Sequence, residues 1–215
     1  MAQTFQVQVE DMVGTVETTV GSGASDTTAI TSWLTDGAKE VINAMPPNLL
    51  ILCAAEATAF TPQVPGSESS ASVLNTGKVF NVRRNDGTID QPCRMILSNI
   101  KGRASDPHDM DYATATDPVY YIESNNLNIL PSASSAVGKY SEVQYPAVAY
   151  GDSAIAVFPD EAEYLVVLYA AMKAVERISA NYNVDEDPEM AMSRKLQYDW
   201  LSGQYAKGIQ ILRGQ

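Results

Sequence analysis

The chain has 215 residues, of which 45% are hydrophobic, so it can bury a sizeable core in one domain or two. Its 14 lysines and arginines are outnumbered by 26 aspartates and glutamates, and the formal net charge of -12 disfavours a lasting grip on nucleic-acid phosphates. We therefore expect no specific nucleic-acid binding.

Cysteine usage and hydropathy exclude two further classes. Cys53 and Cys93 cannot form a structural zinc site by themselves, so we expect buried thiols or at most one bridge in a reducing compartment. The N-terminus lacks the basic and apolar regions of a secretion signal, and no run approaches about 18 apolar residues. The chain is expected to be neither exported by a signal peptide nor membrane-spanning.

Two helices are predicted near the N-terminus. Between Thr4 and Gly14, which can act as cap and stop, apolar residues recur at helical spacing. A second apolar series begins after Ser25 or Asp26, and two prolines end it. The members of this series are Ile30, Trp33, Leu34, Gly37, Ala38, Val41 and Met45.

Residues 49–157 have the texture of a β region, because the helical period disappears and prolines and glycines recur. Asp86-Gly87 lies between two strand-like segments and is suited to a tight hairpin. A second hairpin is predicted from residues 119–123 to residues 127–130, turning at residues 124–126. The segment "GKYSEVQYPAV" predicts a further strand.

The helical pattern returns at Phe158. Asp160 and Glu163 form a capping pair, and the helix that follows is apolar almost all round, which is typical of a helix buried on every side. Asp187 with Pro188 begins a last helix. In that helix several apolar side chains can face a partner: Met192, Leu196, Trp200, Ile209 and Leu212.

These elements predict an α+β fold, in which N-terminal and C-terminal helices form a bundle that carries an inserted antiparallel β domain. The expected parts are N-terminal helices in 1–48, a β-rich insertion in 49–157 and C-terminal helices in 158–215 that pack with 26–45.

Few residues suggest chemistry. His108 lies among aspartates in "SDPHDMDY", which fits a solvated acidic loop better than an oxygen-rich metal site. Ser153 in "GDSAI" resembles the serine block of one hydrolase class, but no histidine follows it to act as base. Gly77-Lys78 lacks the remaining residues of a phosphate loop. We expect no catalytic residues, no metal site and no cofactor, and hence no enzyme.

Two arginines and two tryptophans are further candidates for binding. Arg83 and Arg84 precede a predicted hairpin turn, where exposed charge is the default and an anion clamp the alternative. Trp33 and Trp200 occupy apolar helical positions, so core packing is favoured over ligand stacking.

The apolar helix after Phe158 has more hydrophobic surface than a small bundle needs, and large exposed apolar patches usually mark interfaces. We therefore expect this helix to contact neighbouring subunits. The candidate interface residues are Tyr164, Val167, Leu168, Ala171 and Val175.

Three segments, "ITSWLTDGAKEVINAMPPNLL", "DPVYYIESNNLNILP" and "FPDEAEYLVVLYAAMKAVERI", resemble in this order the head-to-tail connector (adaptor or neck) proteins of tailed bacteriophages. The resemblance covers roughly residues 26–182. It implies a virion structural protein in the neck that forms a dodecameric ring under the portal protein, contacts further neck or tail proteins and extends the DNA channel. Assembly would take place in the host cytoplasm.

The resemblance also implies that the C-terminal segment reaches the portal, with Tyr205, Ile209, Ile211 and Leu212 as candidate portal-binding residues. Deleting residues 203–215 is then expected to abolish portal binding without affecting the fold. A tail-terminator or head-completion protein of the neck is the alternative, and a hydrolase using His108 or Ser153 is a third, less favoured reading.

Overall fold

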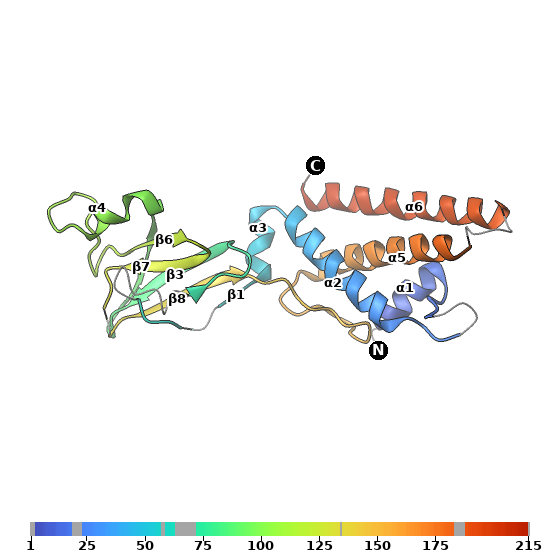
Figure 1. Cartoon of the computed structure of the whole chain (residues 1–215), viewed down its shortest axis with the longest axis horizontal. Coiled ribbons are helices and arrows are strands. Elements are labelled where there is room, and N and C mark those ends of the chain that lie inside the picture. Colours follow the sequence, from blue (N-terminus) through green and yellow to red (C-terminus); the bar gives the residue numbers. More distant parts are fainter. Residues whose placement is uncertain are drawn as a thin grey trace. The chain divides into compact units, whose positions relative to one another are not determined.

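The computed structural model describes residues 3–18, 23–56, 59–62, 72–133, 135–182 and 188–214. It confirms the predicted α+β class, with six α-helices among these residues and with helices on both sides of the strand region along the chain (Figure 1). The chain forms two compact units, Met1–Cys53 with Tyr145–Gln215 and Ala54–Gln144. The strand-containing unit is thus narrower than the 49–157 expected, because residues 49–53 and 145–157 belong to the helical unit.

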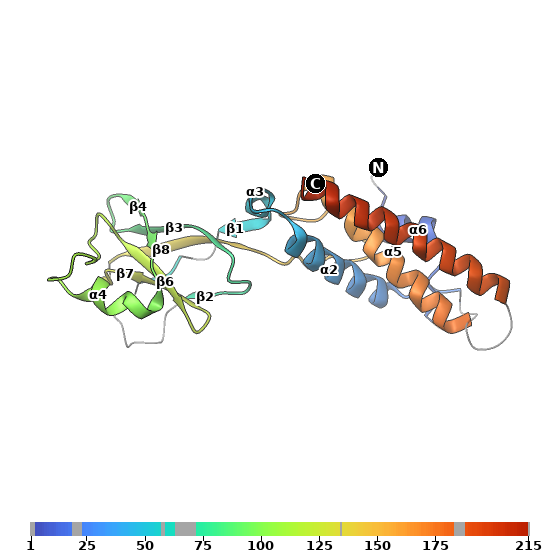
Figure 2. The ribbon, with the colours of Figure 1, turned by 90° about the horizontal axis from the view of Figure 1, so that it is seen from above.

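The described part of the helical unit contains five α-helices and a short 3-10 turn. The helices are α1 (Phe5–Val13), α2 (Thr27–Ala44), α3 (Pro47–Leu50), α5 (Asp160–Tyr182) and α6 (Pro188–Leu212), and the turn is Ile51–Cys53. Helices α1, α2 and α6 each pack against α5, which makes α5 the centre of the unit (Figures 1 and 2). Within the described ranges, none of the helices combines the length and apolar composition that a membrane span requires.

Local signals set the ends of the first two helices as predicted. Gly14 ends α1 with a positive φ of 85° and donates its N–H to the Glu10 carbonyl. Asp26 caps α2, since its carboxylate accepts from the Ala29 N–H at 3.0 Å. Met45 is extended before the prolines, so the chain leaves the helix there.

The buried side of α2 carries the predicted apolar series. Ile30, Leu34, Ala38 and Val41 are fully buried and recur every three or four residues. Trp33 is half-buried next to this apolar series. The Arg177 guanidinium lies 5.9 Å from the centre of its ring, in a cation–π contact.

The second unit is built from two four-stranded sheets, ordered β1-β8-β3-β4 and β2-β7-β6-β5. Among the described strands all pairs are antiparallel except β5 with β6, which is parallel, so the expected antiparallel domain contains one parallel pair. The strands are β1 (Ala54–Glu56), β2 (Ser72–Val73), β3 (Val79–Asn85), β4 (Asp90–Pro92), β5 (Arg94–Met95), β6 (Val119–Glu123), β7 (Asn126–Leu130) and β8 (Val137–Val143). One helix, α4 (Lys101–Ser105), follows a 3-10 turn at Ser98–Ile100.

Both predicted hairpins form. Gly87 has a φ of 100° between β3 and β4, and its N–H donates to the Asn85 side chain at 2.6 Å. Ser124 and Asn125 have positive φ between β6 and β7, whereas Asn126 already pairs with Glu123 inside the sheet. The turn is therefore one residue shorter than predicted.

Candidate interaction surface

The apolar surface of helix α5 packs against other helices of the same chain. Val167, Leu168, Ala171 and Val175 are all buried, because α1, α2 and α6 surround α5. The expectation that these four side chains face a neighbouring subunit is therefore corrected: their surface is already covered. Tyr164, at 48% exposure, is the one member of that group with substantial free surface.

Tyr164 lies at a tight contact between α5 and α6. A Cβ atom at Gly208 would lie 2.7 Å from the Tyr164 hydroxyl and still closer to Leu165. The two helices thus approach at a position that only glycine can occupy without displacement.

Unpartnered apolar surface is found on α6 instead. Met192, Leu196, Trp200 and Ile211 are 67%, 62%, 59% and 63% exposed, respectively. At 100° per residue these side chains share one side of the helix, and Lys207 lies among them. We call Met192, Leu196, Trp200, Lys207 and Ile211 the α6 stripe. For Trp200 the sequence favoured core packing over ligand stacking and also allowed it to face a partner, and the structure leaves most of its side chain in solvent.

The other side of α6 is firmly anchored, which fixes the direction in which the stripe faces. Leu201 is fully buried, and the Tyr205 ring lies 6.1 Å from the Tyr169 ring of α5. Near the other end, Gln197 donates to the Met12 carbonyl at 2.6 Å, and Arg194 donates to the Val13 carbonyl at 3.3 Å. Burial, with the nearby Glu40 carboxylate as a second cause, raises the pKa of Tyr205 well above its ordinary value.

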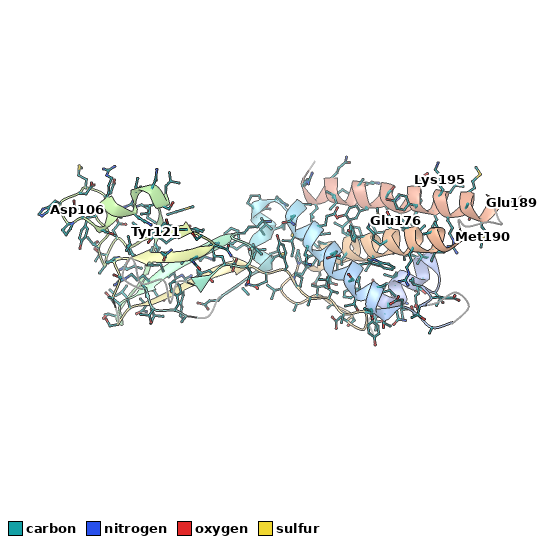
Figure 3. The ribbon with its side chains drawn as sticks, viewed as in Figure 1. Asp106, Tyr121, Glu176, Glu189, Met190 and Lys195 are labelled. Carbon is teal, nitrogen blue, oxygen red and sulfur yellow. The ribbon has the colours of Figure 1, made fainter. Side chains whose placement is uncertain are left out.

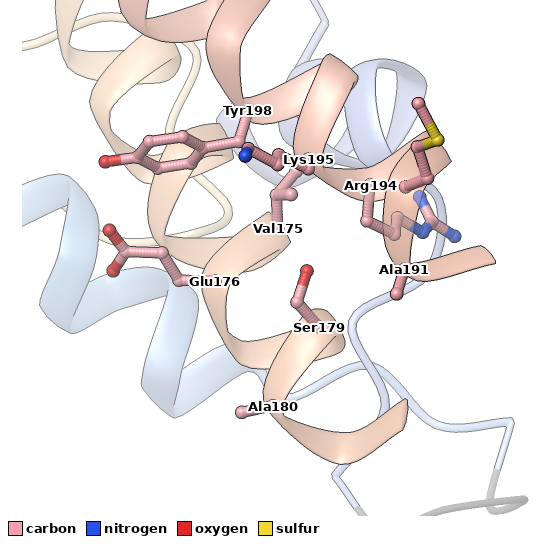
Figure 4. A pocket seen from close by; sticks show the side chains of 9 residues that line it. Val175, Glu176, Ser179, Ala180, Ala191, Arg194, Lys195 and Tyr198 are labelled. Carbon is pink, nitrogen blue, oxygen red and sulfur yellow. The ribbon is translucent and has the colours of Figure 1, made fainter. Parts of the chain in front are cut away.

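A groove of about 870 Å³ adjoins the stripe, between the second half of α5 and the first half of α6. It is lined by Val175, Glu176, Ser179, Ala180, Ala191, Met192, Arg194, Lys195 and Tyr198. Met192 belongs to both surfaces. Figure 3 locates Glu176 on α5 and Lys195 on α6, and Figure 4 shows Lys195 and Tyr198 across from Val175 and Ser179.

The candidate portal-binding residues do not share one surface. Ile211 is exposed in the stripe, whereas Tyr205, Ile209 and Leu212 are partly buried. Arg213, just beyond the helix, donates from Nε to the Ala44 carbonyl at 3.2 Å. Residues 203–214 are therefore part of the helical unit, and the expectation that their deletion spares the fold is corrected.

Charge is unevenly distributed over the helical unit. Helix α6 and the residues after it carry the cations Arg194, Lys195, Lys207 and Arg213 against the anions Glu189 and Asp199. Residues 3–18 and 145–164 contain neither lysine nor arginine. Their carboxylates are Glu10, Asp11, Glu17, Asp152, Asp160, Glu161 and Glu163. The helical unit thus combines an acidic region that has no cations with a helix of nearly balanced charge.

The acidic loop around His108 is organised by an arginine. Arg103 contacts Asp109 and Asp111, each at 3.0 Å, and the Asp106 carboxylate accepts from the His108 backbone N–H. The Arg103 hydrogen bond lowers the pKa of Asp109. The described residues contain no group of three or more His, Cys, Asp or Glu side chains placed to hold a metal ion.

The other residues that the sequence offered as binding or catalytic candidates do not come together in one site. Arg83 is exposed, whereas Arg84 is buried and donates to the Pro131 carbonyl at 3.0 Å. Since consecutive strand residues point to opposite faces, these two guanidinium groups do not form a common clamp. Ser153 is exposed in the segment before α5, and Gly77 donates its backbone N–H to Glu142.

No protein-family model matches the chain, and no curated protein shows significant sequence similarity to it.

Proposed function

We propose that this chain is a virion structural protein, the head-to-tail connector of a tailed bacteriophage. In this proposal its copies form a dodecameric ring between the portal protein and further neck or tail proteins, and the ring extends the channel through which DNA passes. The observation that carries the proposal is the α6 stripe, in which four large apolar side chains are about three-fifths or more exposed along one side of a helix whose other side is buried.

The stripe supports assembly for an energetic reason. Each large apolar side chain that moves from water into an interface contributes roughly 1.5–3 kcal/mol before the costs of association. Tryptophan is among the residues that most often dominate interface energetics. Proteins rarely leave four such side chains exposed to water along one side of a helix, so this surface is expected to bind a partner.

Charge is compatible with the same role. A channel that lets DNA slide must not retain it, and the net charge of -12 opposes strong phosphate binding. The loop carboxylates Asp109 and Asp111 pair with Arg103, which favours a structural role for the loop around His108. The proposal accordingly gives the chain a structural role.

Cryo-electron microscopy of the intact particle tests this function. A ring of twelve copies in contact with the portal is the expected result. A ring of six farther down the neck would favour the tail-terminator alternative. Absence of the chain from the particle would overturn the structural proposal.

A further inference from the structure

We propose that the α6 stripe of one subunit docks on the outer side of α1 in a second copy of this chain, in a head-to-tail contact. We call the receiving surface the α1 face and define it by Val7, Glu10, Asp11, Tyr150 and Asp152. This inference rests on the proposed function only in that a ring needs such a contact.

The α1 face is a continuous local surface. The Phe5 N–H donates to the Asp152 carbonyl at 2.8 Å, and the Gln6 N–H donates to the Tyr150 carbonyl at 2.9 Å. The start of α1 is therefore tied to residues 150–152. Phe5, Val9 and Val13 are the buried side of α1, so Val7 and Asp11, one turn apart, lie on its outer side.

The α1 face combines apolar and acidic groups. Val7 and Tyr150 are about two-fifths exposed, and the same two segments carry the exposed Asp11 and Asp152 and the partly buried Glu10. It thus offers the apolar contact that Leu196 and Trp200 lack. It also offers the negative charge that complements Lys207 within the stripe and Lys195 beside it.

Charge favours this partner over a symmetric pair. Helix α6 itself is nearly balanced in charge, since Arg194, Lys195 and Lys207 are offset by Glu189 and Asp199, so a stripe-to-stripe pair gains little net attraction. The α1 face carries only carboxylates as charged groups, so there Lys207 of the stripe meets opposite charge.

Gln197 and Arg194 of α6 bond to the last carbonyls of α1. Leu196 and Trp200 of the stripe and Val7 and Asp11 of the α1 face are exposed beside this contact, so one subunit can use both surfaces at once, as a ring requires.

A complementation experiment on the full chain tests the contact. Variant A is Leu196→Asp with Trp200→Asp, and variant B is Val7→Lys with Asp11→Lys. Each changes two exposed residues one helical turn apart. Sedimentation velocity of wild type, A, B and an equimolar mixture of A and B gives the masses, and circular dichroism checks folding.

The expected result has three parts. The wild type associates with increasing concentration, more weakly as salt rises. Variants A and B each lose at least about 30-fold in self-association, the size of one strong interface residue. The mixture forms two-subunit complexes and nothing larger, because A retains the α1 face and B retains the stripe.

Matched controls separate the contact from general effects. Ala191→Asp adds a charge at an exposed position of α6 on the side away from the stripe, and Glu56→Lys makes the charge change of Asp11→Lys in the second unit. Both are expected to associate like the wild type. If A or B fails to fold, Leu196→Ser and Val7→Ser replace them.

Three results would overturn the inference: a wild type that stays monomeric at every concentration, a variant A or B that associates normally, or impaired variants that do not complement. These outcomes are distinct from failure of the proposed function. If the chain forms a portal-bound ring but the variants do not complement, the proposed function holds and this contact is wrong. If the variants complement but the chain is absent from the particle, the contact holds and the proposed function is wrong.

Discussion

Gly37 of α2 faces Tyr169 of α5 so closely that a Cβ atom at position 37 would lie 2.9 Å from Tyr169 Cδ1. The same ring packs near Tyr205 of α6 on another side. Tyr169 therefore connects three helices, and Gly37 is the position that lets α2 approach it. The pair explains why a glycine occurs in the buried series of α2.

Substituting Gly37→Ala is expected to lower the free energy of unfolding by roughly 1–3 kcal/mol, because the added methyl group overpacks this contact. Urea unfolding followed by circular dichroism measures the change. The matched control is Gly203→Ala on α6, where a Cβ meets open space and helix propensity predicts a gain of up to about 1 kcal/mol. An equal response of the two variants would contradict the packing explanation.

Glu142 is a buried carboxylate that holds the turn before β3. It accepts from the Thr76 N–H at 2.6 Å and from the Gly77 N–H at 3.0 Å. Glu142→Ala leaves both donors without this acceptor and is expected to lower the free energy of unfolding by about 2–4 kcal/mol. Glu56→Ala, at an exposed ion pair with Lys139, is the control and should change it by less than about 0.5 kcal/mol.

Asp26 makes the helical unit sensitive to acid. The hydrogen bond from Ala29 and the contact with Arg177, whose Nη1 lies 2.7 Å from the carboxylate, hold the pKa of Asp26 below its usual 3.8. A lowered folded-state pKa contributes stability that is present above pH 3.8 and is lost as pH falls through the folded value. Asp26→Asn should therefore be less stable than the wild type by about 0.5–1 kcal/mol at neutral pH. Thermal unfolding between neutral and acidic pH checks that the difference disappears in acid.

Cys93 should be a slow nucleophile in the folded chain, because burial raises the pKa of its thiol to about 12. Cys53 is fully buried beside Met45. A disulfide-exchange reagent at mildly alkaline pH is expected to label either native thiol at least about 100-fold more slowly than a small free thiol. Both should react once the chain is unfolded. An exposed reference thiol introduced by Ala206→Cys should react quickly, and equally fast labelling of Cys93 would refute the burial.

The portal hypothesis needs a point variant rather than a deletion. Removing residues 203–215 takes away Gly208 at the α5 contact and the Arg213 bond to Ala44, so we expect loss of stability by thermal unfolding. Ile211→Asp changes only an exposed side chain and should leave the unfolding midpoint nearly unchanged. If the end of α6 contacts the portal, this variant reduces portal capture in a pull-down, and unchanged capture would argue against it.

Features that depend on a few consecutive residues could be predicted. The Asp26 cap, the Gly14 stop and the hairpin at Asp86-Gly87 are local because their hydrogen bonds join residues at most four apart. Pairings across the chain could not be predicted in this way. Strand β8 lies between β1 and β3, and Ala54 pairs with Val143, far away in sequence. Such pairings depend on how both sheets close around a core.

By itself the sequence determined the α+β class and the ends of the helices. It also determined that the helix after Phe158 is too apolar to remain exposed to water. Only the tertiary structure decided where that apolar surface is used. Val167 and Val175 are covered within the chain, whereas Leu196 and Trp200 remain exposed. Periodicity shows that a helix has an apolar side, but the neighbours that cover it come from distant segments. The candidate interface accordingly lies on α6 rather than on the more hydrophobic α5.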